Sequence, residues 1–89
     1  MTRQRYGVRV TVRLDANVND PQGNAIRDGL RTLGHGDVDD VRVGKVIDLT
    51  LDAADAGAAE SRARQLCEDL LANPVIESYE IDVAEVAIA

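Results

Sequence analysis

Hydrophobic side chains alternate with polar ones over the stretch Val38–Leu51, and this pattern constrains the fold more than any other feature of the chain. The aliphatic residues that occupy odd positions are Val41, Val43, Ile47, Leu49 and Leu51. Period-two spacing of this kind places all of them on one face of a strand. A hairpin at Gly44–Lys45 would turn the two halves of the pattern to opposite faces. The parity therefore favours one long strand, bent or bulged at Gly44, with a three-residue turn that keeps the faces in phase as the alternative.

Alternation also predicts a first strand over Arg5–Leu14 and a last strand over Ser78–Val83. The outward positions of the first strand are basic, with Arg5, Arg9 and Arg13, and those of the last strand include Glu80 and Asp82. If the two strands lie side by side, cross-strand ion pairs can fix their register; two independently solvated faces are the alternative. Beyond the last strand, the tail Glu85–Ala89 changes parity and is either a bulged continuation or a docked tail.

Two helices are predicted between these strands. Asp20 and Pro21 form a helix start, with Asp20 as N-cap and Pro21 at the first helical position. Ile26, Leu30 and Leu33 then repeat with the spacing of one helical face. A second helix is predicted from about 56 to 72 and ends at Asn73-Pro74, because the residue before proline disfavours helical geometry. Its predicted apolar stripe consists of Ala59, Ala63, Leu66, Cys67, Leu70 and Leu71.

The order strand, helix, strand, helix, strand predicts an α+β fold, namely a two-layer sandwich with both helices on one face of the sheet. The 89 residues are too few for more than one domain, which spans 1–89. Hydrophobic residues make up 45% of the chain, but Phe and Trp are absent and only two residues are Tyr. Because so thin a core contributes little stability, we expect the chain to bury further surface in an oligomer.

Charge and cysteine usage exclude several classes of protein. A formal charge of −6 argues against a nucleic-acid-binding protein, which needs a basic surface. The single Cys67 excludes an internal disulfide and is typical of a reducing compartment. The alternating pattern that follows Met1 predicts neither a signal peptide nor a membrane span, so we expect a cytoplasmic protein.

Residues suited to catalysis are few. His35 is the only imidazole and lies in a turn between two glycines, while Cys67 falls on a predicted apolar face. The aspartates near His35 lack the spacing of a calcium loop, and no metal site is predicted. A bulge at Gly44 could bring Arg42 and Lys45 together as an anion site, but an ion-paired or partner-docking surface is favoured. Two hypotheses remain: an assembly subunit, or a regulatory module that senses a metabolite at a dimer interface.

Three motifs carry a resemblance to a known family. They are Asp20-Pro21-Gln22-Gly23, then Asp40-Val41-Arg42-Val43-Gly44-Lys45 with Asp48-Leu49-Thr50-Leu51, and finally the run Cys67–Tyr79. In this order and spacing they resemble the PurS family, the small subunit of phosphoribosylformylglycinamidine synthase. The resemblance extends from about Tyr6 to Val83.

This resemblance implies a ferredoxin-like sandwich that forms dimers, sometimes tetramers, through its strands. It implies a non-catalytic subunit that bridges a glutaminase subunit and a large synthetase subunit. It also implies that the complex uses ATP and Mg while this subunit binds no cofactor. For Asp20, Pro21 and Asn73, helix capping and helix termination are favoured over direct partner contact. The residues predicted at partner interfaces lie within the matching motifs: Asp20, Pro21, Gln22, Gly23, Arg42, Gly44, Lys45, Asn73, Glu77 and Tyr79.

Overall fold

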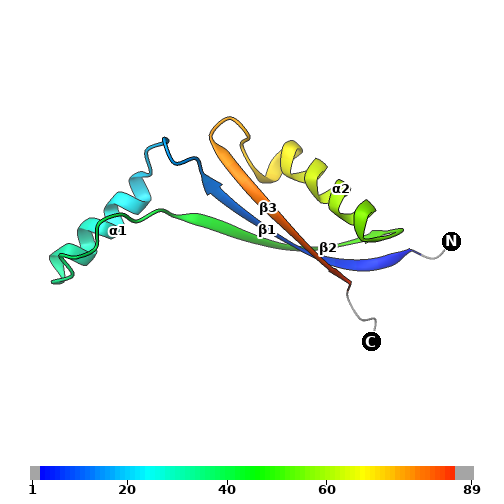
Figure 1. Ribbon diagram of the computed structural model, residues 1–89, viewed down its shortest axis with the longest axis horizontal. Coiled ribbons are helices and arrows are strands. Elements are labelled where there is room, and N and C mark those ends of the chain that lie inside the picture. Colours follow the sequence, from blue (N-terminus) through cyan, green and yellow to red (C-terminus); the bar gives the residue numbers. More distant parts are fainter. Residues whose placement is uncertain (1–2, 86–89) are drawn as a thin grey trace.

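The computed structural model of the protein describes residues 3–85 and has an α+β fold (Figure 1). Its elements are β1 (Gln4–Leu14), α1 (Pro21–Thr32), β2 (Gly44–Ala53), α2 (Ala56–Leu66), a π-helical turn (Cys67–Leu71) and β3 (Glu77–Glu85). This order confirms the predicted succession of strands and helices. Of the predicted tail Glu85–Ala89, Glu85 is the last residue of β3, and residues 86–89 lie outside the described residues. Neither α1 nor α2 has the length and apolar character needed to span a bilayer.

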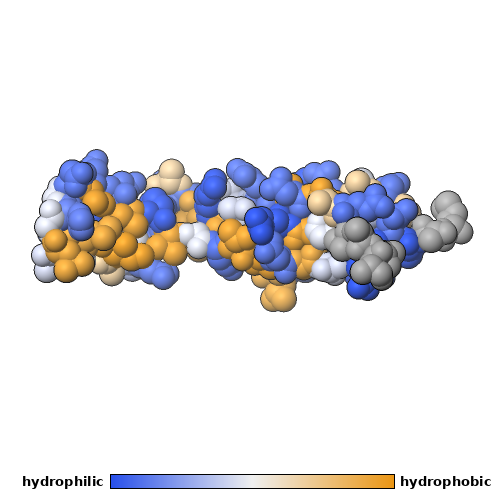
Figure 2. Space-filling model, turned by 90° about the horizontal axis from the view of Figure 1, so that it is seen from below, coloured by the Kyte–Doolittle hydropathy of each residue, from blue (hydrophilic) through white to orange (hydrophobic). Residues whose placement is uncertain are grey.

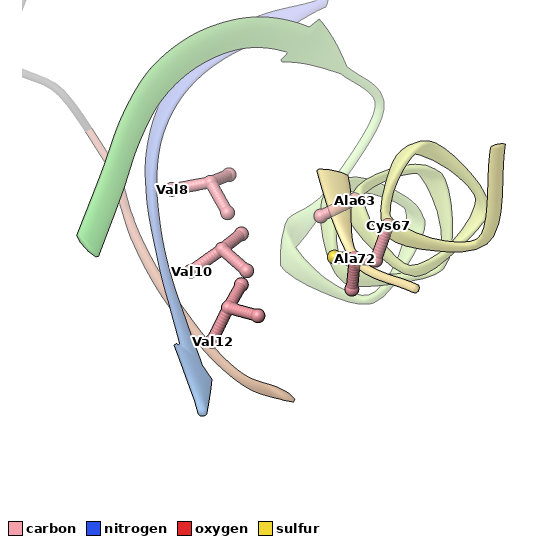
Figure 3. Close-up of a cluster of buried hydrophobic side chains, with 6 residues drawn as sticks. All are labelled: Val8, Val10, Val12, Ala63, Cys67 and Ala72. Carbon is pink, nitrogen blue, oxygen red and sulfur yellow. The ribbon is translucent and has the colours of Figure 1, made fainter. Parts of the chain in front are cut away.

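The three strands form an antiparallel sheet in the order β2-β1-β3, so β1 is central. Val8, Val10 and Val12 of β1 are at most 2% exposed and form the middle of the core. Figure 3 shows these valines pointing toward Ala63, Cys67 and Ala72. Small side chains on α2 let the helix approach the sheet closely and bury the valines, and Tyr79 packs against the same cluster.

The predicted odd-position face is confirmed within β2. Ile47 and Leu49 lie opposite Val10 and Val8 of β1 and pack against the core. However, the predicted long, bent strand is wrong in its extent. β2 begins at Gly44, and residues 38–43 pair with no other strand in the described structure. Gly44 is therefore the first residue of a regular strand, where an added Cβ would lie 2.7 Å from the Val12 carbonyl oxygen.

The predicted placement of both helices on one sheet face is also wrong. α2 packs against all three strands, whereas α1 lies beyond the end of the sheet (Figure 1). Residues 38–43 continue the line of β2 past the sheet and run beside α1, so the helix is carried away from the core. We call residues 15–43 the arm, and the remainder of residues 3–85 the sheet half. The radius of gyration of 17.3 Å reflects this shape, because a compact domain of this length has about 12 Å.

The apolar stripe of α2 ends differently from the prediction. The Ala72 N–H donates to the Cys67 carbonyl oxygen at 3.0 Å, which is the wider hydrogen bond of a π turn. This turn inserts one residue, so the buried series Ala59, Ala63, Cys67 continues to Ala72. Leu70 was predicted on the stripe but is 84% exposed.

Candidate assembly interface

Asp20 joins the two segments of the arm where the arm meets the sheet half. Its side chain is buried at 3% exposure. Oδ1 accepts a hydrogen bond from the Gly23 N–H at 2.9 Å, and Oδ2 accepts one from the Val43 N–H at 2.7 Å. The first bond caps α1 and confirms the predicted N-cap. The second bond ties the helix start to the residue that precedes β2.

Backbone contact at the same place requires a glycine. Gly23 is buried, and an added Cβ would lie only 2.1 Å from the Val41 carbonyl oxygen. Nearby, Arg42 donates from Nη2 to the Asp15 carbonyl oxygen at 2.8 Å, which links the end of the arm to its beginning. We call Asp15, Asp20, Gly23 and the segment 41–43 the clasp.

The electrostatics of the clasp favour an ionised Asp20. Hydrogen bonds from the Val43 and Gly23 N–H groups, and then the charge of Arg42, hold the pKa of the Asp20 carboxyl below its ordinary value. Burial acts in the opposite direction but is outweighed. The carboxylate is consequently charged at neutral pH and retains both of its hydrogen bonds.

Apolar side chains of α1 remain without cover. Leu33 is 76% exposed and Ile26 is 41% exposed, although both belong to the stripe that was predicted to face a sheet. Leu30 and Val38 are half-buried, and Arg31 donates from Nε to the Val38 carbonyl oxygen. Figure 2 shows hydrophobic side chains gathered at the α1 end of the molecule. We call Ile26, Leu30, Leu33 and Val38 the arm surface; exposed apolar surfaces of this kind are typical of protein interfaces.

The face of the sheet opposite α2 carries charged rows. Arg5 pairs with Asp52 at 3.4 Å, Arg9 with Asp48 at 2.8 Å, and Arg13 with Glu80 at 3.6 Å. Only the Arg13–Glu80 pair joins the first and last strands as predicted. Arg9 lies opposite Asp82 in the register, but its hydrogen bonds go to Asp48 on β2.

These pairs are more than half exposed, so each contributes little to stability. The side-chain hydrogen bond from Arg9 lowers the pKa of Asp48, and the same bond raises the pKa of Arg9.

The structure brings half of the predicted interface residues together. A hollow of about 240 Å³ lies where the arm meets the sheet half. Its walls include the predicted residues Asp20, Gln22, Gly44, Lys45 and Glu77. Gly23 adjoins this group through its hydrogen bond to Asp20, and Pro21 is the exposed first residue of α1. Arg42 lines a different hollow from Lys45, so the two side chains do not form the anion site that was the less favoured alternative for this segment.

The remaining predicted residues close the connection between α2 and β3. The Asn73 N–H donates to Glu77 Oε1 at 2.6 Å, and Asn73 Oδ1 accepts from the Val75 N–H. Tyr79 donates its hydroxyl to Glu68 Oε2 at 2.8 Å, a bond that raises the pKa of Tyr79. These contacts give Asn73, Glu77 and Tyr79 structural roles within the chain.

Cys67 and the acidic side chains were considered in the sequence for chemistry, and the structure describes both. Cys67 is fully buried, and burial raises the pKa of its thiol, which makes it a poor nucleophile. The described residues contain no group of three or more side chains placed to hold a metal ion. Sequence reasoning assigned Leu33 and Leu70 to apolar stripes that face the core, whereas the structure leaves both side chains exposed.

Comparisons with known proteins identify the family of the chain. The family model of PurS, phosphoribosylformylglycinamidine (FGAM) synthase, matches residues 7–85. The PurS subunit of phosphoribosylformylglycinamidine synthase from Bacillus subtilis is 42% identical over 81 residues, which cover 91% of this chain and 95% of that protein. The corresponding subunit from Synechocystis is 46% identical over 74 residues, covering 83% of this chain and 74% of that protein.

Solved structures give the same result. The structure of B. subtilis PurS matches with a TM-score of 0.82 at 41% identity, covering 90% of this chain and 99% of that chain. A chain in the structure of PurLQS from Thermotoga maritima matches with a TM-score of 0.79 at 35% identity, covering 92% of this chain and 98% of that chain.

Proposed function

The chain belongs to the PurS family of phosphoribosylformylglycinamidine (FGAM) synthase, and we propose that it is the non-catalytic assembly subunit of that enzyme. In this role it bridges a glutaminase subunit, which releases ammonia from glutamine, and a large ATP-dependent synthetase subunit. The synthetase uses the ammonia to convert formylglycinamide ribonucleotide to the amidine in purine biosynthesis. The main observation in support of this proposal is the arm, which projects from the sheet half and exposes the apolar side chains Leu33 and Ile26.

Ammonia transfer supplies the physical reason for such a subunit. Ammonia made in one protein must reach a second site without escaping to solvent or being protonated. Both sites therefore have to be held in a fixed and sealed relation. A small rigid sheet with an anchored arm offers two separate surfaces for that purpose.

We also propose that the subunit acts as a homodimer or a tetramer of such dimers. Among the described residues, β2 and β3 each pair only with β1, so each leaves one backbone edge for a second copy. The exposed apolar side chains of the arm surface can be buried against a second copy of the chain, since most soluble oligomers are symmetric assemblies of identical chains. Catalysis, ATP and magnesium then belong to the larger partners, and the complex works in the cytoplasm.

Reconstitution with the purified glutaminase and synthetase subunits tests this function. With glutamine as nitrogen source, synthesis of the amidine should require the present chain. With ammonium chloride, the synthetase should work with or without it. Full glutamine-dependent synthesis in its absence would refute the assembly role. A metabolite-sensing module would instead bind a nucleotide or amino acid by itself, which titration calorimetry would detect.

A further inference from the structure

The arm depends on very few contacts for its orientation. α1 makes no extensive contact with any strand, and the chain enters and leaves the arm through single segments at Asp15–Asp20 and Val43–Gly44. A helix joined in this way would swing relative to the sheet unless something fixed both segments at its base. The clasp is the structure found at that point.

We propose that Asp20 is a positioning residue, which sets the direction of the arm by bonding both of its segments and thereby presents the arm surface for assembly. This inference rests on the proposed function for its biological meaning, but the bracing itself follows from the geometry. A plain N-cap would need only the bond to Gly23. The second bond, at 2.7 Å to the Val43 N–H, spans 23 positions in the sequence and adds nothing to the helix.

Three further observations support a brace in addition to a cap. The carboxylate is buried, as the joint between two segments must be. The close approach of Gly23 to the Val41 carbonyl holds the segments in contact beside it. The hydrogen bond from Arg42 to the Asp15 carbonyl oxygen is a second connection between the two segments at the base of the arm. Hydrogen bonds to a carboxylate are stronger than those to a neutral acceptor, so Asp20 can hold the projecting arm firmly with two bonds.

Asp20→Asn separates the two roles of this side chain. Asparagine is as good an N-cap as aspartate, so α1 should keep its helicity by circular dichroism. Its amide offers one acceptor oxygen in place of two, so the bond to Val43 is lost. We expect hydrogen exchange at the Val43 amide to accelerate roughly tenfold, while the amides of Val8 and Val10 in the core exchange as before. Glutamine-dependent synthesis should fall severalfold, with ammonia-dependent synthesis unchanged.

Asp55→Asn is the matched control. Asp55 caps α2 through the Ala58 N–H at 2.7 Å, but its side chain is exposed and bonds no second segment among residues 3–85. This variant should leave Val43 exchange and glutamine-dependent synthesis at wild-type values. If Asp20→Asn behaves like Asp55→Asn in both measurements, the bracing role is refuted.

Arg42→Gln provides a second route if Asp20→Asn does not fold. Arg42 is exposed, and losing its bond to Asp15 should loosen the same joint in the same direction. Unchanged Val43 exchange in this variant would overturn the proposal. Failure of the proposed function can be distinguished from failure of the bracing proposal. If the proposed function is wrong, the wild-type chain will not support glutamine-dependent synthesis, whatever the exchange rate at Val43 is in the variants.

Discussion

The sheet half and the arm each contain one helix with an apolar stripe, yet only the sheet half buries that stripe. On α2, Ala59, Ala63 and Cys67 are fully buried against the strands. On α1, the corresponding stripe leaves Leu33 and Ile26 at 76% and 41% exposure. The two helices are similar in length, so size does not explain the difference.

Side-chain size and anchoring do explain it. The small residues of α2 fit closely over the valines of β1 and leave that core complete. α1 carries larger aliphatic residues and is fastened by Asp20 to a segment that runs past the sheet. The comparison indicates a division of labour, in which the sheet half supplies folding stability and the arm supplies surface for assembly.

The largest expected effect is on association through the arm surface. Replacing both Ile26 and Leu33 by serine should weaken self-association by roughly 100-fold or more, because each buried aliphatic side chain contributes about 1.5–3 kcal/mol and about 1.4 kcal/mol is a tenfold change. Sedimentation equilibrium measures this, and circular dichroism should show an unchanged fold. Leu70→Ser is the control, since Leu70 is 84% exposed but lies on the sheet half. A double variant that associates as tightly as the wild type would show that the arm surface is not used between copies.

The second test addresses the contact between the two segments of the arm. Gly23→Ala should destabilise the protein by up to about 3 kcal/mol, because backbone has to move to relieve the overlap with Val41. Gly29→Ala is a matched control in the same helix, where an added Cβ meets nothing within 4 Å. That control should gain up to about 1 kcal/mol from better helix propensity. Urea unfolding measures both; equal effects at the two glycines would contradict a tight clasp.

The third test addresses the core of the sheet half. Val10→Ala should lower the free energy of unfolding by about 2 kcal/mol, through lost burial and the cavity left behind. Val46→Ala is the control, because Val46 lies on β2 but is 58% exposed and should change little. Self-association measured under native conditions should be unaffected by either change. Loss of association in Val10→Ala with the fold intact would break the proposed division between the two halves.

Much of the fold is predictable from local patterns in the sequence. Period-two alternation identified β1, β3 and the buried face of β2, and the Asp20–Pro21 pair identified the start of α1. Periodicity tells which residues share a face, but it does not tell what covers that face. The place of α1 depends on the bond between Asp20 and Val43, which are 23 positions apart. For the same reason, the exposed residues of the arm surface were taken for core.

The candidate site shows the same limit. Helix capping by Asp20 was predictable because its partner Gly23 lies three residues away. Lys45, Gln22 and Glu77 were predicted at partner interfaces only through the family resemblance, and their position around one hollow was not predicted. The sequence did not determine the ion pairs on the open face, which is the face of the sheet opposite α2. Because β1 is central, Arg9 has a carboxylate on each neighbouring strand, Asp48 and Asp82.

The smallest expected effect concerns this open face. Arg9→Gln removes the bonds that lower the pKa of Asp48. A carboxyl whose pKa is lowered by folding adds stability above its unfolded pKa of about 3.9, and this stability is lost as the pH falls through the folded value. The urea midpoint of Arg9→Gln should therefore lie slightly below that of the wild type at pH 7, and the difference should disappear as the pH falls through the folded pKa of Asp48. Because both side chains are more than 60% exposed, added salt should also narrow the difference. A large, salt-insensitive difference would mean that the open face is covered in the assembled protein, and the sheet half would then share the assembly role with the arm.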